Sequence, residues 1–380
     1  MRVLIIGVGG VGAMAAWHLA KAGHEVIALE RFHLDHDQGS SYGESRIVRR
    51  VYPDTLYTAL MGEAYRLWDE LMTEADDCSL FIQAGGVFCG SADHPHVLAA
   101  QEALAASAVP YEVLNAQQCA ARFPAFVLQE NEHAVYEPSM GYAHASLCLR
   151  TAARLARQHG ADIREGNPVI SLQAETGGSG VRVTLADGTE LTADRLLLTA
   201  GPWVGPHLAE FGITVPLVVT RQPYLHLEPA SHSEDFEPGR FPVWIDAEAN
   251  AYGFPHLNYV AGVKIGIHDR GTITTPETVD RTVQEEDREA VRRYAKHRFP
   301  QLSTTITYEK VCLYTNTPEE DFIVDAIPGL PGGYVISGCS GHGFKFTPLL
   351  GQIAAHLATD MPLSYDLSRF QLSRFSSAHA

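Results

Sequence analysis

A short glycine-rich motif near the start of the chain restricts the fold more than any other feature. Residues 2–6 are apolar after Arg2 and are expected to form a buried strand, and the motif that follows at residues 7–12 is expected to open a helix that reaches about Lys21. Residues 25–30 are then expected to form a second strand. This order of strand, helix and strand predicts the first βαβ unit of a Rossmann-like α/β domain.

The glycine spacing indicates a bound dinucleotide. Gly7, Gly9 and Gly12 fit the pattern GxGxxG, in which the missing side chains let a pyrophosphate reach the N-terminus of the helix. Glu30 ends the second strand, where a carboxylate accepts hydrogen bonds from ribose hydroxyls, and this favours FAD or NAD over a 2′-phosphorylated cofactor. The motif alone does not choose between FAD and NAD, and a structural glycine-rich turn is the alternative.

Chain length and the order of the elements predict two domains. A chain of 380 residues exceeds the roughly 250–300 residues at which a single core stops growing. A strand, a loop and a helix return near the C-terminus after a central region of extended segments, so we expect a discontinuous dinucleotide-binding domain and a sheet-rich substrate domain. The expected bounds are 1–80, 140–215 and 320–380 for the first domain, and 81–139 and 216–319 for the second.

Periodicity places further elements along the chain. Thr55–Met72 has apolar residues at close to a 3.6-residue spacing, which predicts a helix. The pair Asp187-Gly188 predicts the turn of a hairpin whose strands are Val181–Leu185 and Leu191–Leu198. The other expected elements are extended segments at 217–227 and 251–266, a charged helix at 277–297, a strand at 333–338, a helix at 348–359 and a surface turn at 177–180.

Charge and composition restrict the partners. The chain has 28 Lys and Arg against 45 Asp and Glu, and the formal charge of −17 repels phosphate backbones and anionic membranes, so we expect no nucleic-acid or membrane partner. No run of about 18 apolar residues is present, and Gly7 comes too early for a signal peptide. The six cysteines form no CxxC pair or zinc-type cluster. These features predict a cytoplasmic protein without a metal site.

Several segments beyond the βαβ unit resemble one family of flavoproteins nearly from end to end. They are residues 39–49 (GSSYGESRIVR), 252–255 (YGFP), 263–268 (VKIGIH), 312–322 (CLYTNTPEEDF) and 340–346 (SGHGFKF). In these segments the chain resembles the monomeric sarcosine oxidase and N-methyltryptophan oxidase family of D-amino-acid-oxidase-like flavoproteins. The resemblance implies that the dinucleotide is FAD.

Cys312 is the residue at which the resemblance implies a covalent flavin. In the family the cysteine of this segment forms a thioether with the 8α-methyl carbon of the flavin, because the electron-poor ring makes that methyl group acidic enough for a thiolate to add. A buried core thiol is the usual fate of a cysteine, and the other five cysteines keep that interpretation. We therefore expect FAD to be attached through Cys312.

The resemblance also implies a cationic substrate pocket. Arg49 and Lys345 match two family residues that bind the substrate carboxylate, for which Arg offers a bidentate fork and Lys a compact charge. Arg46 matches an arginine placed near the flavin ring. The alternative for each is an ordinary surface cation.

A polar strand face is expected to complete the site. Lys264 matches a family lysine whose charge assists the reduction of dioxygen, and strand alternation places His268 on the same face as Lys264. Tyr252 matches an active-site tyrosine, although one extra residue separates it from Lys264. The expected catalytic residues are therefore Lys264, His268, Arg49, Lys345 and Tyr252. The expected cofactor contacts are Gly7, Gly9, Gly12, Glu30, Arg31, Ser40, Arg46, Gly201, Cys312, Gly341, Gly343, Phe344 and Lys345.

The implied reaction is the oxidative demethylation of an N-methyl amino acid such as sarcosine by a monomeric enzyme, with dioxygen as oxidant and with the amino acid, formaldehyde and hydrogen peroxide as products. One alternative is oxidation of another secondary amine, such as N-methyltryptophan, proline, pipecolate or a fructosyl amino acid. A second is a flavin dehydrogenase that passes electrons to an acceptor other than oxygen. The net charge disfavours a tRNA-modifying flavoprotein, and a non-enzymatic FAD-binding protein is the remaining alternative.

Overall fold

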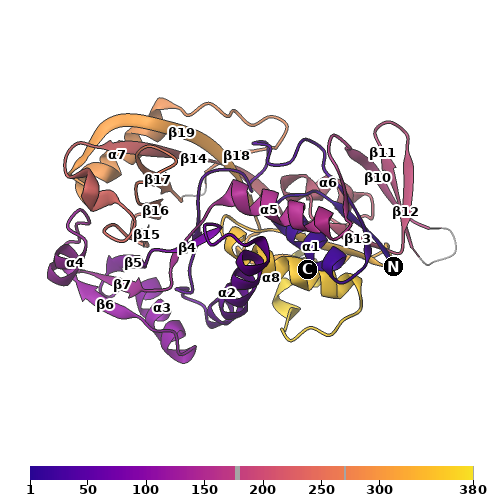
Figure 1. Cartoon of the computed structure of the whole chain (residues 1–380), viewed down its shortest axis with the longest axis horizontal. Coiled ribbons are helices and arrows are strands. Elements are labelled where there is room, and N and C mark those ends of the chain that lie inside the picture. Colours follow the sequence, from indigo (N-terminus) through magenta and orange to yellow (C-terminus); the bar gives the residue numbers. More distant parts are fainter. Residues whose placement is uncertain (176–179, 269–270, 380) are drawn as a thin grey trace.

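The computed structural model describes residues 1–175, 180–268 and 271–379, and these residues form two lobes (Figure 1). Both ends of the chain lie in the same lobe, on the right of Figure 1, while the long central strands form most of the other lobe. The chain passes between the lobes several times, so neither lobe is a continuous stretch of sequence.

The first lobe is built on a six-stranded sheet. Its strands, in spatial order, are β20 (Ile323–Ala326), β21 (Gly333–Ser337), β13 (Arg195–Leu198), β1 (Arg2–Ile6), β2 (Glu25–Leu29) and β9 (Asp162–Arg164). Neighbouring strands are parallel except that β20 runs antiparallel to β21. The helix α1 (Gly10–Lys21) connects β1 to β2, because parallel neighbours need a crossover. The predicted βαβ unit and the α/β class are confirmed.

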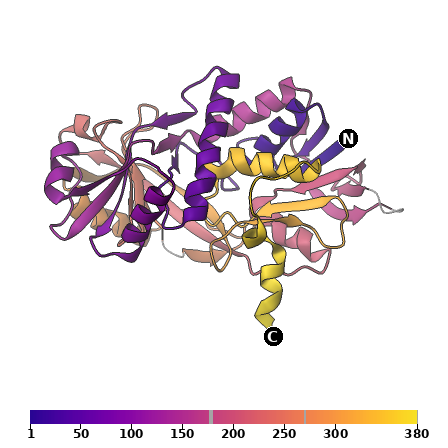
Figure 2. The ribbon, with the colours of Figure 1, turned by 90° about the horizontal axis from the view of Figure 1, so that it is seen from below.

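Successive residues of this sheet serve two different cores, because side chains alternate between the faces of a strand. Val3 and Ile5 pack with α1 and with α2 (Thr55–Ala75), α5 (Ala145–Gln158) and α8 (Thr347–Ala358). Figure 2 shows α2 standing between the two lobes. Leu4 and Ile6 pack on the other face against α6 (Val204–Ala209) and a three-stranded sheet of β10 (Val169–Ala174), β11 (Val181–Leu185) and β12 (Glu190–Ala193).

The second lobe contains a nine-stranded sheet. One run of its strands is β18 (Thr272–Thr274), β14 (Val218–Pro229), β17 (Val263–Ile267), β16 (Ala251–Phe254), β15 (Val243–Asp246), β5 (Gly86–Ser91), β7 (Glu132–Glu137) and β6 (Glu112–Asn115), and β19 (Leu302–Asn316) pairs with β14. The helices α3 (Pro95–Ala106), α4 (Ala116–Arg122) and α7 (Glu285–Arg298) accompany it. Leu225 and Ile265 face α7 in the core, so the alternate residues Tyr224 and Lys264 face the opposite way.

A buried ion cluster ties α7 to this sheet. Arg298 is 7% exposed, and its guanidinium lies 2.6 Å from a carboxylate oxygen of Glu132 in β7 and 2.6 Å from one of Asp246 in β15. The hydroxyl of Tyr294 donates to the same Asp246 carboxylate at 2.9 Å. These bonds compensate the cost of burying the three charges.

Two expected elements differ from the structure. The segment Leu191–Leu198 is not one strand, because the chain bends at Asp194, whose carboxylate accepts a hydrogen bond from the backbone N–H of Arg2 at 2.7 Å. The segment therefore contributes β12 to the hairpin and β13 to the parallel sheet. The charged helix begins at Glu285 rather than 277, because Gln284 and Asp287 form a capping box at its N-terminus.

Other expected elements occur with small changes at their ends. The extended segment expected at 251–266 consists of β16 and β17 with a loop between them, and the turn expected at 177–180 lies mainly outside the described residues. A small sheet of β3 (Arg46–Val48), β8 (Gly141–Ala143) and β4 (Phe81–Gln83) completes the strands. In the described part of the chain, no helix has the length and apolar character needed to cross a membrane.

The strands of the two large sheets come from different segments of the chain. All strands of the six-stranded sheet lie within 1–80, 140–215 and 320–380, and all strands of the nine-stranded sheet lie within 81–139 and 216–319. The exception to a clean division is β4, which pairs with β8 of the other domain. We propose these bounds for the two domains.

Candidate functional site

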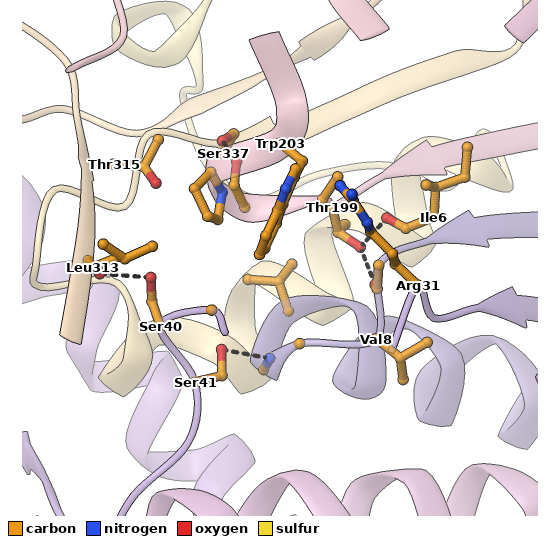
Figure 3. Close-up of a pocket in the computed structure, with 18 of the residues that line it drawn as sticks. Ile6, Val8, Arg31, Ser40, Ser41, Thr199, Trp203, Leu313, Thr315 and Ser337 are labelled. Carbon is orange, nitrogen blue, oxygen red and sulfur yellow. Dashed lines mark hydrogen bonds between the residues drawn. The ribbon is translucent and has the colours of Figure 1, made fainter. Parts of the chain in front are cut away.

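A cavity of about 640 Å³ extends across the carboxyl end of the parallel sheet. This is the edge at which open α/β sheets bind ligands, and the volume lies within the range of about 300–1,000 Å³ that is usual for ligand pockets. Figure 3 shows Val8 and Arg31 at one end of the cavity, Trp203 in the middle, and Ser40 and Leu313 at the other end. The cavity is therefore elongated, as a dinucleotide site requires.

The glycine turn brings the start of α1 to the wall of the cavity. Gly7 has φ +88°, which favours glycine, and a Cβ atom there would lie 2.7 Å from the carbonyl oxygen of Thr199. A Cβ atom at Gly12 would lie 2.0 Å from the carbonyl oxygen of Gly7. Gly12 therefore allows α1 to pack closely on its own turn, and unlike Gly7 and Gly9 it does not line the cavity.

Glu30 is held as a charged carboxylate at one end of the cavity. It accepts hydrogen bonds from the backbone N–H groups of Val8 at 2.9 Å and Phe32 at 3.0 Å, and His36 Nε2 lies 3.3 Å from it. Burial alone would raise the pKa of Glu30, but these hydrogen bonds hold it below its usual value. An ionised Glu30 is suited to accept hydrogen bonds from ribose hydroxyls.

Arg46 organises the opposite end. Its guanidinium donates to the carbonyl oxygens of Ser40 at 3.0 Å, Tyr42 at 2.7 Å and Ser45 at 2.8 Å, and the hydroxyl of Ser40 donates to the carbonyl oxygen of Leu313 at 2.6 Å. These bonds fix the segment before β3 against β19. The neighbouring thiol of Cys312 is 6% exposed and lines the cavity.

A second cavity, of about 180 Å³, adjoins the first. The residues that line both cavities are Arg46, Cys312, Tyr314, Gly341 and Phe344. Arg49, Tyr252, Lys264, His268 and Lys345 line the second cavity only, and these are the five residues expected to be catalytic. The structure thus brings together, in the second cavity and where it meets the first, side chains that are up to about three hundred residues apart in the sequence.

Two cations that line the second cavity, the buried Lys345 and the half-buried Arg49, meet at Tyr52. The guanidinium of Arg49 lies 3.9 Å from the ring centroid of Tyr52, and Lys345 Nζ donates to the Tyr52 hydroxyl at 3.0 Å. Burial, and then the charge of Arg49, holds the pKa of Lys345 well below its usual value. Within the described residues neither cation has an ion pair, and an anionic ligand would therefore offset their repulsion.

The hydrogen bonds around Tyr52 determine which group donates and which accepts. His342 Nε2 lies 2.9 Å from the carbonyl oxygen of Glu320, which only accepts, so Nε2 carries the proton. Burial, and then Lys345, holds the pKa of His342 well below its usual value, and the neutral ring accepts at Nδ1 from the Tyr52 hydroxyl at 3.1 Å. The Tyr52 oxygen is thereby left to accept from Lys345. Tyr52 and His342 position the ammonium group.

Lys264 also lines the second cavity. The side chain is 2% exposed, and its Nζ atom lies 3.3 Å from the carbonyl oxygen of Ser45. Tyr252 and Lys264 belong to the neighbouring strands β16 and β17, as the expected strand face requires, while His268 follows the end of β17. The His268 ring lies 5.1 Å from the Tyr314 ring between centroids, which places it beside the junction of the cavities.

Comparison with known proteins agrees with this geometry. The model of the family described as FAD dependent oxidoreductase matches residues 2–357. The chain is 33% identical to monomeric sarcosine oxidase of Streptomyces avermitilis, over 100% of this chain and 98% of the relative. It is 31% identical to N-methyl-L-tryptophan oxidase of Yersinia pestis, over 98% and 99% of the two chains.

The chain belongs to the FAD dependent oxidoreductase family. L-proline dehydrogenase of P. horikoshii has the same fold, with a TM-score of 0.85 at 23% identity over 99% of this chain and 97% of that chain. Membership in this family decides between FAD and NAD in favour of FAD, a choice that the glycine motif alone left open.

Two polar atoms indicate that the first cavity accepts a polar ligand. The indole N–H of Trp203 and the hydroxyl of Thr347 are buried in its wall, and neither has a hydrogen-bond partner among the described residues. Together with the glycine turn and the ionised Glu30, they fit FAD as the family requires. Of the expected cofactor contacts, Gly7, Gly9, Glu30, Arg31, Ser40, Arg46, Gly201, Cys312, Gly341, Gly343 and Phe344 line this cavity, whereas Gly12 and Lys345 do not.

Sequence reasoning missed the residues that hold the expected ones in place. Tyr52 and His342 position Lys345, and Glu44 and Tyr224 contact Lys264. The sequence offers only a weak indication for Tyr52, namely that it lies three residues after the expected substrate-binding residue Arg49. Tyr224 has none, because its contact depends on the pairing of β14 with β17.

Proposed function

We propose that this FAD-dependent amine oxidase demethylates a small N-methyl amino acid such as sarcosine and uses dioxygen as the final oxidant. One amine, one dioxygen and one water give one amino acid, one formaldehyde and one hydrogen peroxide. The observation that carries the proposal is the pair of cations, the half-buried Arg49 and the buried Lys345, that meet at Tyr52 beside the end of the flavin cavity. The curated relatives named as sarcosine and N-methyltryptophan oxidases support the reaction type.

The size of the second cavity favours a small substrate. Its volume of about 180 Å³ lies below the range of about 300–1,000 Å³ usual for drug-sized ligands. Phe88, Ile245 and Phe254 supply an apolar wall. Sarcosine or a small cyclic amino acid therefore fits this space better than N-methyltryptophan or a fructosyl amino acid.

The chain's own residues orient the amine. Arg49 and Lys345 bind the substrate carboxylate and so direct the N-methyl group away from Tyr52, toward the junction where Cys312 lies. We assign His268 to proton exchange with the amine, because an imidazole can donate and accept a proton and this ring lies on the cavity wall. When FAD is bound, it supplies the two-electron acceptor for the N-methyl carbon and passes both electrons to dioxygen.

Lys264 serves the reaction with dioxygen. Its ammonium group stabilises the negative charge that dioxygen acquires on accepting an electron, since the site is buried and the charge is fixed in place. We further propose that the flavin is attached to the Sγ atom of Cys312, the thiol that lines both cavities. We also propose that the enzyme is a cytoplasmic monomer. Size-exclusion chromatography with light scattering tests the oligomeric state.

One experiment tests the reaction directly. Purified protein is mixed anaerobically with sarcosine, and flavin bleaching is followed before oxygen is admitted. Formaldehyde and peroxide released in equal amounts are the expected result. Bleaching by sarcosine without peroxide on aeration would indicate a dehydrogenase, and bleaching only by proline would transfer the proposal to a cyclic amine.

A further inference from the structure

The ammonium group of Lys264 lies among groups that favour its charged form. Its Nζ atom is 3.3 Å from the carbonyl oxygen and 3.4 Å from the hydroxyl of Ser45, and it lies over the ring of Tyr224 at 3.9 Å from the centroid. A carboxylate oxygen of Glu44 is 3.9 Å away. A carbonyl oxygen, an aromatic face and a carboxylate all interact more strongly with an ammonium than with a neutral amine.

Glu44 is itself fixed and charged. The hydroxyl of Tyr224 donates to its Oε2 atom at 3.0 Å, and Tyr308 lies on the neighbouring strand β19 facing the same carboxylate. Burial alone would raise the pKa of Glu44, but Lys264 and the two tyrosine hydroxyls lower it to about 2. The negative charge is therefore present throughout the pH range in which such an enzyme works.

The other charged and titratable groups around Lys264 do not replace Glu44. Arg46, the first residue of β3, opposes a positive charge on Lys264, and Cys312 on β19 and Tyr252 on β16 also face this region. His226 on β14 is paired in register with Lys264, is 1% exposed and has its pKa lowered to about 3 by burial and by Lys264, so it is neutral. Glu44 is thus the carboxylate that the described residues place against this ammonium group.

We infer that Glu44 is a positioning residue that keeps Lys264 protonated and fixed beside the flavin site, and that it thereby sets the pH range in which dioxygen is reduced. The inference rests on the proposed function and adds to it the control of the oxygen reaction. Conversion of one dioxygen to one hydrogen peroxide takes two electrons and two protons. Lys264 stabilises the developing negative charge in this step and is itself chemically unchanged at its end.

The structure supports an electrostatic role for Glu44 in addition to packing. Burial, and then Arg46, lowers the pKa of Lys264 to about 7, and Glu44 is the first of the groups that act against this. A group with a pKa near neutrality loses charge when a nearby opposite charge is removed, so a neutral residue at position 44 moves the protonation midpoint of Lys264 to lower pH.

The decisive variant is Glu44→Gln, which keeps the shape and an acceptor for the tyrosine hydroxyls but removes the charge. The flavin of each protein is reduced photochemically without amine, and its reoxidation by dissolved oxygen is followed by stopped-flow absorbance between pH 5.5 and pH 9. Because no amine is used, a wild-type protein that reoxidises rapidly but ignores sarcosine refutes the proposed substrate alone. A wild-type protein that does not react with oxygen refutes the proposed oxidant instead.

We expect the midpoint of the reoxidation profile to lie about 1–2 pH units lower in Glu44→Gln, since one nearby opposite charge shifts a pKa by about that amount. Above both midpoints the rate constant then falls roughly 10- to 100-fold, one factor of ten for each unit. Glu44→Asp, which keeps the charge, is expected to restore most of the profile. Glu63→Gln, a matched change on the surface of α2, is expected to leave the profile unchanged.

A second readout does not depend on turnover. The visible absorbance of the oxidised flavin is titrated with pH, and a step that disappears in Lys264→Met reports the protonation of Lys264. This step is expected to move to lower pH in Glu44→Gln. A fall in rate at every pH with an unmoved midpoint overturns the inference. If Glu44→Gln does not fold, Glu44→Ala, which also removes the charge, takes its place, and an unmoved midpoint in that protein overturns the inference as well.

Discussion

The Sγ atom of Cys312 lies 3.7 Å from the Nη2 atom of Arg46, at the place where the two cavities meet. Arg46 is itself held by backbone carbonyl oxygens, so its position does not depend on the thiol. Burial works against the charge of Arg46, but Cys312 and nearby tyrosines raise its pKa, so the guanidinium stays charged. A fixed cation therefore lies beside the sulfur atom to which we propose that the flavin is attached.

Replacing Cys312 by Ala is expected to leave FAD bound but extractable. The wild-type protein should give a yellow pellet after precipitation with acid, and the Cys312→Ala pellet should be colourless with the flavin in the supernatant. Cys339→Ala is a matched control, because Cys339 also lines the first cavity, and it should keep the colour. A yellow pellet from Cys312→Ala would show that the flavin is attached elsewhere.

Arg49→Ala is expected to weaken the binding of carboxylated amines selectively. Hydrogen bonds to a charged group contribute about 1.5–3 kcal/mol, so the KM for sarcosine should rise roughly 10- to 100-fold, with a much smaller change for an uncharged secondary amine. Arg50→Ala serves as the control, because the Arg50 guanidinium lies over Tyr65 and does not line the second cavity. Equal losses for both amines would contradict a role for Arg49 in carboxylate binding.

Lys264→Met is expected to slow the reaction of the reduced flavin with oxygen at pH values below about 7, where Lys264 carries its charge in the wild-type protein. In the wild-type protein this rate should fall as the pH rises through about 7, since Lys264 loses its charge above its pKa. Lys310→Met tests the specificity of the effect, because Lys310 lies on β19 with an exposed ion pair to Asp37. Stopped-flow absorbance measures both. A Lys310 variant as slow as the Lys264 variant would argue against a specific oxygen site.

Gly12→Ala is expected to destabilise the protein and weaken flavin retention. Its Cβ atom would lie 2.0 Å from a backbone oxygen, and overpacking of this kind costs about 1–3 kcal/mol or more. Gly62→Ala, in the middle of α2 with open space around it, should instead stabilise by about 0.5–1 kcal/mol. Chemical denaturation and the flavin-to-protein ratio measure the two effects, and equal stability of the two variants would refute the argument.

Arg298→Met is expected to lower the free energy of unfolding by about 3–5 kcal/mol, because it leaves Glu132 and Asp246 buried without their cation. Arg66→Met removes a surface arginine that pairs with Glu63, and exposed pairs contribute about 0–1 kcal/mol. Denaturant titration of both variants compares them. A loss below about 1 kcal/mol for Arg298→Met would mean that water reaches the cluster.

Much of the fold followed from local patterns. The βαβ unit was predicted because a buried strand, a glycine turn and an apolar helix all have short-range signals, and Glu30 lies where that unit requires a carboxylate. The five expected catalytic residues line one cavity, but sequence periodicity alone would not have assembled them. The resemblance to a flavoprotein family supplied that set.

Long-range contacts limited the rest. The segment Leu191–Leu198 was expected to be one strand, because its apolar pattern continues across Asp194, and the hydrogen bond from Arg2 that accompanies the bend comes from nearly two hundred residues away. Glu44 lies in the segment 39–49 that resembles the flavoprotein family, but the sequence did not single it out. Its role depends on Tyr224 and Lys264, which reach it through the register of β14 and β17.

The position of β21 between β13 and β20 has a consequence for biosynthesis. The N-terminal βαβ unit ends at Leu29, but β20, β21 and α8, which complete its sheet and cover α1, come from residues 323–358. At about 5–20 residues per second this interval lasts roughly 15–60 s. For that time the nascent chain exposes the apolar face of α1, and the cofactor cavity is incomplete. A chaperone that shields the nascent chain would therefore act before the flavin can bind, and premature termination after residue 320 would yield an aggregation-prone product.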